Sequence, residues 1–468
     1  MKNKVGFIFS GGYVVDELKL SFGLICPTNL PLKNKLLFDH QLEFLKKRGC
    51  NKVYLVIPEN YHIKIHENQL YSNNSSSLID TFKLIPSVKE DIDVVEILYG
   101  DSLVDLEPVD IDSNIIGYGK SDFDYNWGLK IDDKVPVGYF HLNFNILNNL
   151  LKSSSTFNIL LEKLLSNELI IPKNVDNWLD FGHNSSFFSS RKKFLETRHF
   201  NEFKLINNFI CKKSNDYFKM FCEYKWLNEM KNRLPSNIPY VYDFKLFNSY
   251  ASYKIEYLNY PSINEMIVFG NFSYEFEKDL VKKLIIITEK IGSPSLNNNR
   301  ISDSFISKKL VKRKKKIIEL YSDLEHMVDE CVSYFHNKKM YYSTIHGDLC
   351  YSNILYNKKD NQFFLIDPRG YLDDLNGFQM QGPVNYDLYK IGHSFICAYD
   401  QIIFNQSLFD VDIMRDRFSW FCKLTNISSE EMKYGLLQLF LSMIPLHSDR
   451  IDRQNKFHEL CLILYKIT

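Results

Sequence analysis

Blocks of apolar residues separated by polar turns predict the organisation of the first part of the chain. A fully apolar run, Val5–Phe9, is followed by leucines at helical spacing between residues 37 and 45, then by Lys-Arg-Gly and a second apolar run, Lys52–Ile57. Basic residues and glycine close a helix well, because they meet its exposed carbonyls and permit a left-handed turn. Strand, helix and strand predict a parallel βαβ unit, and hence an α/β domain. Leucines at helical spacing predict a further helix over residues 148–168, packed on the sheet.

The pattern changes after about residue 195. Residues 200–214 predict two antiparallel strands, residues 217–234 a helix that ends before Pro235, and residues 240–259 two more strands. Amphipathic helical segments then fill most of the chain to its end. An α+β domain with a small sheet part and a larger helical part is therefore expected.

Composition narrows the classes of protein. The 468 residues favour two or three domains, and 45% hydrophobic with 24% charged residues is typical of a globular chain. The formal net charge of zero gives no overall attraction to nucleic acid, so no nucleic-acid partner is expected. The nine cysteines form no C-x-x-C pair, which favours a reducing cytoplasm, and no apolar stretch reaches the roughly 20 residues of a membrane span, so no stable membrane insertion is expected.

One stretch, Tyr341–Gly370, carries the strongest chemical signal. It reads strand, loop, strand, turn, with His346-Gly347-Asp348 and Asn353 in the loop and Asp367 after the second strand. Phosphoryl transfer to a hydroxyl needs a carboxylate that orients and deprotonates the acceptor, and oxygen ligands that hold Mg²⁺ against the phosphates. The spacing H-x-D-x-x-x-x-N followed by a strand and D-x-x-G is typical of kinases. The alternative is a pair of hairpins whose Asp and Asn residues only cap turns.

With Gly347 in the middle of the first motif, the chain resembles the aminoglycoside phosphotransferase and choline kinase group. The resemblance implies a bilobal protein-kinase-like domain over 196–468, with a small lobe to about residue 260 and a large lobe after it. Asp348 would then be the catalytic base, His346 would brace the loop, and Asn353 and Asp367 would be Mg²⁺ ligands. Asp387, in a helix after the metal loop, would support the site through hydrogen bonds.

The nucleotide side of such a site needs a strand lysine paired with a helical glutamate. Lys212 lies on the same face of the predicted strand as the apolar Ile210, and Glu223 lies in the following helix. Lys213 is the alternative lysine. The purely structural alternative is that Lys212 and Glu223 lie on a solvated strand and helix. The segment that contains Glu256 and Leu258 resembles the group's hinge, where backbone groups would bind adenine.

The first 195 residues resemble the sugar-nucleotide nucleotidyltransferases, which have a Rossmann-like α/β fold. Gly100-Asp101 follows an apolar strand, and Trp178-Leu-Asp180-Phe-Gly182 matches the family's W-x-D-x-G segment, so Asp101 and Asp180 would hold Mg²⁺ for a reaction with CTP or another nucleoside triphosphate. The arginine that binds phosphate in this family is missing after Ser10-Gly11-Gly12, and Thr28 stands at the position where the family has a lysine. Three interpretations of this domain stay open: an active transferase, a degenerate binding or assembly domain, and an unrelated α/β domain. For Asp101, the purely structural alternative is that it caps a turn.

Together the resemblances imply an ATP-dependent, Mg²⁺-dependent phosphotransferase with an alcohol group as acceptor. Its substrate would be a small molecule, a sugar or an amino alcohol, and the first domain would add a nucleotidyl group for surface polysaccharide (capsule) biosynthesis. The alternative is a degenerate transferase joined to a pseudokinase, acting as a nucleotide-binding scaffold. The basic run Lys312–Lys316 favours a solvated helical face, and a role along the approach of an anionic substrate stays open. The sequence leaves the oligomeric state open.

Overall fold

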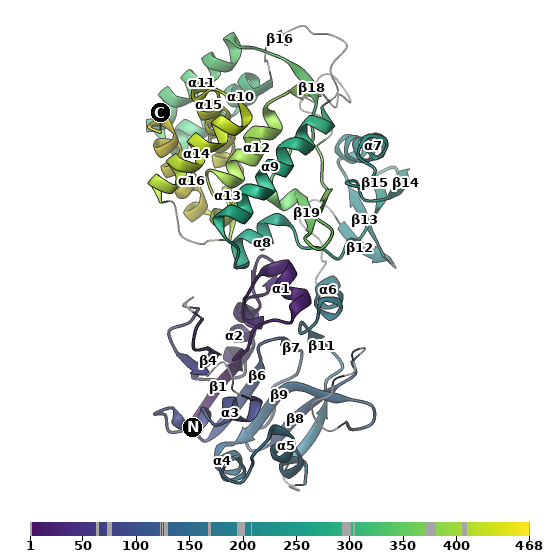
Figure 1. Cartoon of the computed structure of the whole chain (residues 1–468), viewed down its shortest axis with the longest axis vertical. Helices are drawn as coiled ribbons and strands as arrows, with labels where there is room; N and C mark the ends of the chain where they lie inside the picture. The colour runs from purple at the N-terminus through teal and green to yellow at the C-terminus, as the bar shows by residue number, and fades with distance from the viewer. Residues whose placement is uncertain are drawn as a thin grey trace. The chain divides into compact units, whose positions relative to one another are not determined.

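The computed structural model divides the chain into two compact units (Figure 1). One is Met1–Phe194 together with Phe269–Asn271, and the other is Leu195–Val268 together with Phe272–Thr468. The residues that the structure describes are 2–61, 65–72, 77–121, 123, 125, 130–166, 170–193, 202–206, 208–292, 301–302, 305–369, 381–404 and 410–467. The predicted domain boundary after residue 195 lies outside them.

The first unit is built on a seven-stranded sheet in the order β10-β8-β9-β6-β1-β4-β5. β9 runs antiparallel to β6 and β8, while the other neighbours are parallel. The predicted βαβ unit is confirmed, because β1 and β4 are parallel neighbours and α2 joins them. The strands are β1 Lys4–Phe9, β4 Lys52–Pro58, β5 Gln69–Ser72, β6 Val94–Tyr99, β8 Asn114–Gly119, β9 Val135–Asn143 and β10 Ile170–Asn174.

Helices and short ribbons complete this unit. The helices are α1 Asp16–Phe22, α2 Leu37–Lys47, α3 Leu78–Phe82, α4 Phe144–Lys152, α5 Phe157–Leu165 and α6 Asn184–Lys192. The ribbons pair β2 Pro31–Leu32 with β3 Lys35–Leu36, and β7 Ser102–Val104 with β11 Trp178–Asp180.

Both faces of the sheet are covered, which explains why β1 has no charged residue after Lys4. Phe7 packs in one cluster with Leu147 of α4 and Leu160 of α5, whereas Ile8 packs in another with Leu45 of α2. Successive side chains of a strand point to opposite faces of the sheet, so a strand between two apolar layers needs apolar residues on both faces.

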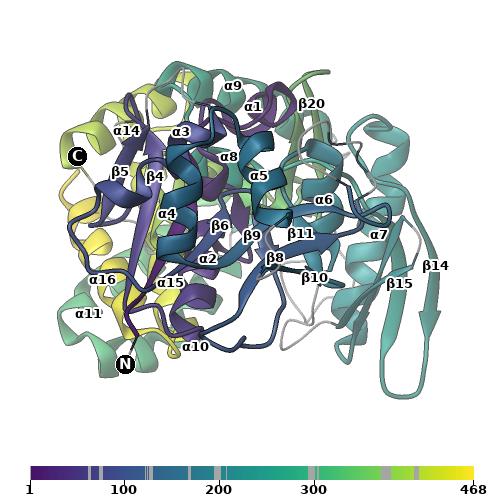
Figure 2. The same cartoon turned by 90° about the horizontal axis from the view of Figure 1, so that it is seen from below.

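The helix expected over 148–168 packs on the sheet as two helices, α4 and α5, side by side (Figure 2). The prediction of one continuous helix is wrong. The side chain of Thr156 accepts a hydrogen bond from the N–H of Ile159 and so caps the start of α5. Such a cap satisfies donors that a continuous helix would bond internally, which favours a new start there.

The second unit begins with the antiparallel sheet and helix that the sequence predicts. The sheet order is β12-β13-β15-β14, and helix α7 spans Tyr217–Arg233. Trp226 of α7 is fully buried, and its indole N–H donates to the carbonyl of Ile345, 2.8 Å away. The strands are β12 Glu202–Ile206, β13 Phe209–Ser214, β14 Val241–Leu246 and β15 Ala251–Glu256.

The rest of this unit is mainly helical, in agreement with the expected α+β class. The helices are α8 Ile263–Phe269, α9 Tyr274–Ile291, α10 Phe305–Leu320, α11 Glu325–Asn337, α12 Tyr386–Phe395, α13 Tyr399–Ile403, α14 Val411–Thr425, α15 Ser429–Met443 and α16 Ile451–Tyr465. No helix among the described residues has the length and apolar character to cross a membrane.

Three short ribbons frame the predicted motif. They pair β16 Ile301–Ser302 with β17 Lys339–Met340, β18 Tyr342–Thr344 with β21 Gln381–Pro383, and β19 Ile354–Asn357 with β20 Gln362–Leu365. The loop from β18 to β19 contains His346, Asp348 and Asn353, and Asp367 follows β20. Strand pairing therefore brings the two halves of the motif together.

Candidate active site

A buried carboxylate fixes the backbone of the loop between β18 and β19. The oxygens of Asp387, in the first turn of α12, accept hydrogen bonds from the N–H of His346 at 2.7 Å and the N–H of Gly347 at 2.8 Å. Burial raises the pKa of Asp387 to about 6, although these two bonds oppose the rise. Gly347 has φ 81°, a left-handed conformation that favours glycine. The sequence prediction that Asp387 supports the loop through hydrogen bonds agrees with this geometry.

His346 connects the loop to the end of β20. Its Nε2 lies 3.1 Å from the carbonyl oxygen of Ile366, and its Nδ1 accepts from the N–H of Asp348 at 3.3 Å. The ring is fully buried and lies nearly perpendicular to the ring of Trp226, and burial lowers its pKa to about 4. A neutral imidazole with its proton on Nε2 satisfies both bonds. Both ring nitrogens of His346 are therefore engaged with the backbone on either side of the site.

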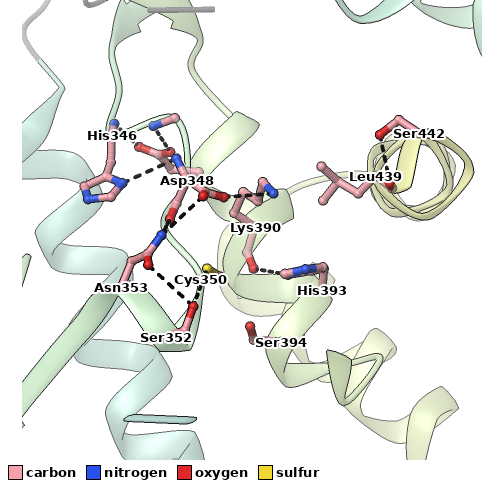
Figure 3. Close-up of polar contacts among 12 residues, drawn as sticks. His346, Asp348, Cys350, Ser352, Asn353, Lys390, His393, Ser394, Leu439 and Ser442 are labelled. Carbon is pink, nitrogen blue, oxygen red and sulfur yellow. Dashed lines mark hydrogen bonds and ion pairs between the residues drawn. The ribbon is translucent and has the colours of Figure 1, made fainter. Parts of the chain in front are cut away.

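Asp348 presents its carboxylate at the surface of the loop, with 42% of the side chain exposed. Lys390 of α12 places its Nζ 3.0 Å from Oδ1 (Figure 3). Burial alone would raise the pKa of Asp348, but Lys390 and then Arg369 outweigh it and hold the pKa at about 2. The carboxylate is thus ionised at neutral pH and is able to accept a hydrogen bond from a hydroxyl group.

The amide of Asn353 is oriented by Asp348. Its Nδ2 donates to the backbone oxygen of Asp348 at 2.8 Å and to Oδ2 at 3.3 Å. The carbonyl of Asn353 also accepts the N–H of Ile366, which ties the loop to the strand before Asp367. With Nδ2 directed at Asp348, the amide oxygen of Asn353 accepts a hydrogen bond from the hydroxyl of Ser352 at 3.5 Å, and its second lone pair is able to serve as an oxygen ligand.

Asp367 joins the loop to the small sheet. Its Oδ1 accepts from the Nζ of Lys212 on β13, 2.7 Å away, and the same Nζ also bonds the carboxylate of Glu223 on α7. Burial lowers the pKa of Lys212, but Asp367 and Glu223 outweigh it and hold the pKa above its ordinary value. Asp367 has φ 54°, an unusual conformation for a residue other than glycine and one that concentrates at functional sites.

The structure distinguishes the two candidate lysines. Lys212 is 4% exposed and paired as described, whereas the Nζ of Lys213 lies 4.3 Å from the ring centre of Tyr250. Tyr253 adds to the first pair, because its hydroxyl donates to Glu223 at 2.5 Å. Of the two, Lys212 is the one that joins the small sheet to Asp367.

The segment expected to bind adenine follows directly from β15. Glu256 is the last residue of that strand, and its N–H donates to the carbonyl of Tyr240 at 2.8 Å. The N–H of Tyr257 donates to the carbonyl of Asn208, also at 2.8 Å. These bonds fix the backbone that leads to Leu258.

Sequence reasoning missed Lys390. The spacing could have indicated it, because Lys390 is three residues after Asp387 and so lies on the same face of the predicted helix. Its pairing with Asp348 became visible only once α12 was placed beside the loop.

In the first unit, the structure brings Asp101 and Asp180 together. A Cβ atom added to Gly182 would lie 3.0 Å from Oδ2 of Asp101 and 3.2 Å from Oδ1 of Asp180, so both carboxylates border this glycine. Burial, and after it the charge of Asp180, raises the pKa of Asp101 to about 7. The hydroxyl of Tyr125 donates to Oδ2 of Asp180 at 2.6 Å.

A cavity of about 530 Å³ lies at the carboxyl ends of β1 and β6, lined in part by Asp101 and by Ser10-Gly11-Gly12. None of the described residues that line it is basic. Thr28, where the resemblance leads one to expect a lysine, is fully buried and bonds Ser10 and Gln41. The cavity therefore offers a carboxylate and neutral groups to a ligand.

Within the described residues, no three His, Cys, Asp or Glu side chains cluster in a way that could hold a metal ion. A Mg²⁺ site that uses one carboxylate and one amide oxygen does not need such a cluster, because phosphates and waters supply the remaining ligands.

No protein-family model and no curated protein matches the chain. Among solved structures, amicoumacin kinase hAmiN in complex with AMP-PNP is 11% identical, with 59% of this chain and 93% of that chain covered and a TM-score of 0.37. A thermostable mutant of aminoglycoside phosphotransferase APH(4)-Ia is 11% identical over 57% and 92%, with a TM-score of 0.41. HddC from Yersinia pseudotuberculosis is 11% identical over 41% and 99%, with a TM-score of 0.29. These likenesses are too distant to assign an activity.

The neutral state of His346 makes stability depend on pH. Between pH 6.5 and 4 the unfolded histidine takes up a proton and the folded one does not, so stability is lost as the pH falls through this window, by up to about 3 kcal/mol. We expect His346→Gln to lose less stability than the wild type over the same window, because its amide can make both bonds without titrating. Urea unfolding followed by tryptophan fluorescence measures the difference.

The raised pKa of Asp387 increases stability as the pH falls, which opposes the effect of His346, but this contribution is the same in the wild type and the variant. Equal pH dependence in the two proteins would show that His346 is protonated in the folded state.

Proposed function

We propose that the second unit is a small-molecule kinase that transfers a phosphoryl group from ATP to a hydroxyl group. The observation that carries this proposal is the bond between Lys212 and Asp367. It joins the sheet lysine and its partner Glu223 to the turn after β20. That turn is bonded to the loop of Asp348 and Asn353, because the N–H of Ile366 donates to the carbonyl of Asn353. Phosphoryl transfer depends mainly on positioning and charge, and these groups are the ones it requires.

Asp348 is the proposed catalytic base. Its carboxylate is ionised and partly exposed, so it can accept a hydrogen bond from the acceptor hydroxyl, orient the oxygen and take its proton. His346 keeps the loop against the end of β20 and does not react.

Asn353 and Asp367 are the proposed ligands of Mg²⁺. The fit is chemical, since an amide oxygen and a carboxylate are oxygen donors of the kind this ion prefers. The Nδ2 of Asn353 is used by Asp348, and its oxygen, which accepts one 3.5 Å bond from Ser352, keeps a second lone pair for the ion. When bound, Mg²⁺ would neutralise charge on the phosphates.

Lys212 is proposed to hold the nucleotide phosphates, with Glu223 fixing the position of its ammonium group. The N–H groups of Glu256 and Tyr257 are bonded within the sheet. Adenine would then use the carbonyl of Glu256 and the N–H of Leu258.

Incubation of the full chain with Mg²⁺-ATP and small hydroxyl compounds tests the proposal. Choline, ethanolamine, glycerol, hexoses and heptoses would each be followed by phosphorus NMR. We expect a new phosphomonoester with at least one of them, and a fall in rate of about 10³-fold in Asp348→Asn, because the acceptor loses its base.

Asp449→Asn is the matched control, since Asp449 is an exposed acid outside the site and the change removes the same charge. Product formed at equal rates by wild type, Asp348→Asn and Asp449→Asn would contradict the assignment. Nucleotide binding without acceptor-dependent product would favour the alternative, a nucleotide-binding scaffold.

We propose a second activity for the first unit, nucleotidyl transfer with CTP or another nucleoside triphosphate. The observation that favours it is the pair of Asp101 and Asp180 beside Gly182, with Asp101 facing the cavity. Two carboxylates whose charges oppose each other gain from a shared cation, and both supply oxygen. Phosphorylation in one unit followed by nucleotidyl transfer in the other would give an activated donor of the kind that surface polysaccharide biosynthesis uses.

Thermal unfolding with Mg²⁺ and CTP tests this second activity. We expect Mg²⁺-CTP to raise the unfolding midpoint by about 2 °C at saturating concentration. The rise should disappear in Asp180→Asn and persist in Asp176→Asn, an exposed acid four residues earlier. A rise that survives Asp180→Asn would place the nucleotide elsewhere. If no nucleoside triphosphate gives a rise that depends on Asp180, the first unit is degenerate.

A further inference from the structure

Three residues on one face of α12 contact the loop between β18 and β19. Asp387, Lys390 and Ser394 are three and four residues apart, a spacing that places them on the same side of the helix (Figure 3). The first two hold residues 346–348, as described above. The hydroxyl oxygen of Ser394, which is buried, accepts a hydrogen bond from the N–H of Tyr351 at 3.3 Å. The helix therefore holds the loop at its start and again at Tyr351.

Tyr351 has a second anchor through its own hydroxyl. The side chain is buried, and its hydroxyl donates to Oε1 of Glu277, a buried residue of α9, at 3.2 Å. The two contacts reach Tyr351 from two different helices, one at the backbone and one at the end of the side chain. Both the position and the direction of this residue are thus fixed.

An ion pair fixes the carboxylate that Tyr351 uses. Arg417 of α14 donates from Nη2 to Oε2 of Glu277 at 2.8 Å, and from Nη1 to the carbonyl of Phe395 at 2.5 Å. Its guanidinium carbon also lies 4.8 Å from the ring centre of Tyr274 and 4.9 Å from that of Phe395. A buried ion pair is maintained only where such contacts satisfy its charges. Glu277 is therefore presented to Tyr351 in one place.

A short 3-10 turn, Tyr351–Asn353, connects this anchor to the proposed metal ligand. The N–H of Asn353 donates to the carbonyl of Cys350 at 3.0 Å, and its Nδ2 donates to the backbone oxygen of Asp348 at 2.8 Å. A single 3-10 turn has poor hydrogen-bond geometry and little stability of its own. The position of Asn353 therefore depends on contacts made by the residue at which the turn begins.

We propose that Tyr351 is a positioning residue for the metal ligand Asn353, and that Glu277 and Ser394 hold Tyr351 in place. The inference rests on the proposed kinase function and names residues that prepare its metal site. Tyr351 acts through the backbone of the turn, since its hydroxyl is bonded to Glu277. Its effect is expected on the requirement for Mg²⁺. Affinity for the nucleotide without metal should not change, because Lys212 lies on the small sheet.

Tyr351→Phe tests the inference, because it removes the hydroxyl and keeps the ring. Calorimetry would follow binding of a non-hydrolysable ATP analogue to the full chain over a series of Mg²⁺ concentrations at constant ionic strength. We expect the Mg²⁺ concentration that gives half of the maximal effect to rise about 5-fold, the size of one lost hydrogen bond. Binding of the analogue without Mg²⁺ should equal that of the wild type.

Tyr465→Phe is the matched control. The hydroxyl of Tyr465 also donates to a carboxylate, that of Glu330, at 2.9 Å. These two residues lie on α16 and α11, outside the site. The Mg²⁺ requirement of this variant should equal that of the wild type, and a rise as large as that in Tyr351→Phe would overturn the inference.

The same change in an Asn353→Ala background shows whether Tyr351 acts through Asn353. With the amide ligand removed, Tyr351→Phe should leave the remaining Mg²⁺ requirement unchanged, because coupled residues are not additive. An equal rise in both backgrounds, or no rise in either, would overturn the inference and leave the kinase intact. Nucleotide binding by the wild type that does not depend on Mg²⁺ would instead contradict the proposed function, and the inference with it.

Discussion

A buried ammonium group is the constraint on which the second unit depends. Lys212 is 4% exposed, and removal of its charge from water is unfavourable unless carboxylates surround it. Glu223 and Asp367 provide them, so β13, α7 and the turn after β20 are held at one point. The left-handed backbone of Asp367, with φ 54°, is maintained by this arrangement. The groups proposed to hold nucleotide and metal are thus positioned before either binds.

The loop between β18 and β19 is also held by charged and buried side chains. Asp387 binds two backbone N–H groups of the loop, His346 joins the loop to the end of β20, and Lys390 keeps Asp348 ionised. Asp367 is paired with Lys212, and Asp348 is paired with Lys390.

Local patterns were enough to predict β1, the βαβ unit and the order of the motif, because each depends on near neighbours in the chain. The break between α4 and α5 was missed, since the cap at Thr156 competes with the leucine periodicity that suggested one helix. The pairing of β7 with β11 brings Asp101 beside Asp180, and the packing of α10 and α12 on α15 brings the Nζ of Lys309 to 5.9 Å from the ring centre of Tyr386. Such contacts join distant segments, so periodicity and spacing do not reveal them.

The most direct test of the account is calorimetric binding of a non-hydrolysable ATP analogue with and without Mg²⁺, in the wild type and in Asp367→Ala. The account predicts binding at the second unit that weakens at least about 10-fold when Mg²⁺ is removed, because metal and Lys212 act on the phosphates together. In Asp367→Ala that dependence on Mg²⁺ should be lost. Binding that depends on Mg²⁺ equally in both proteins, or no binding in either, would contradict the claim that Asp367 and Lys212 form the nucleotide phosphate site.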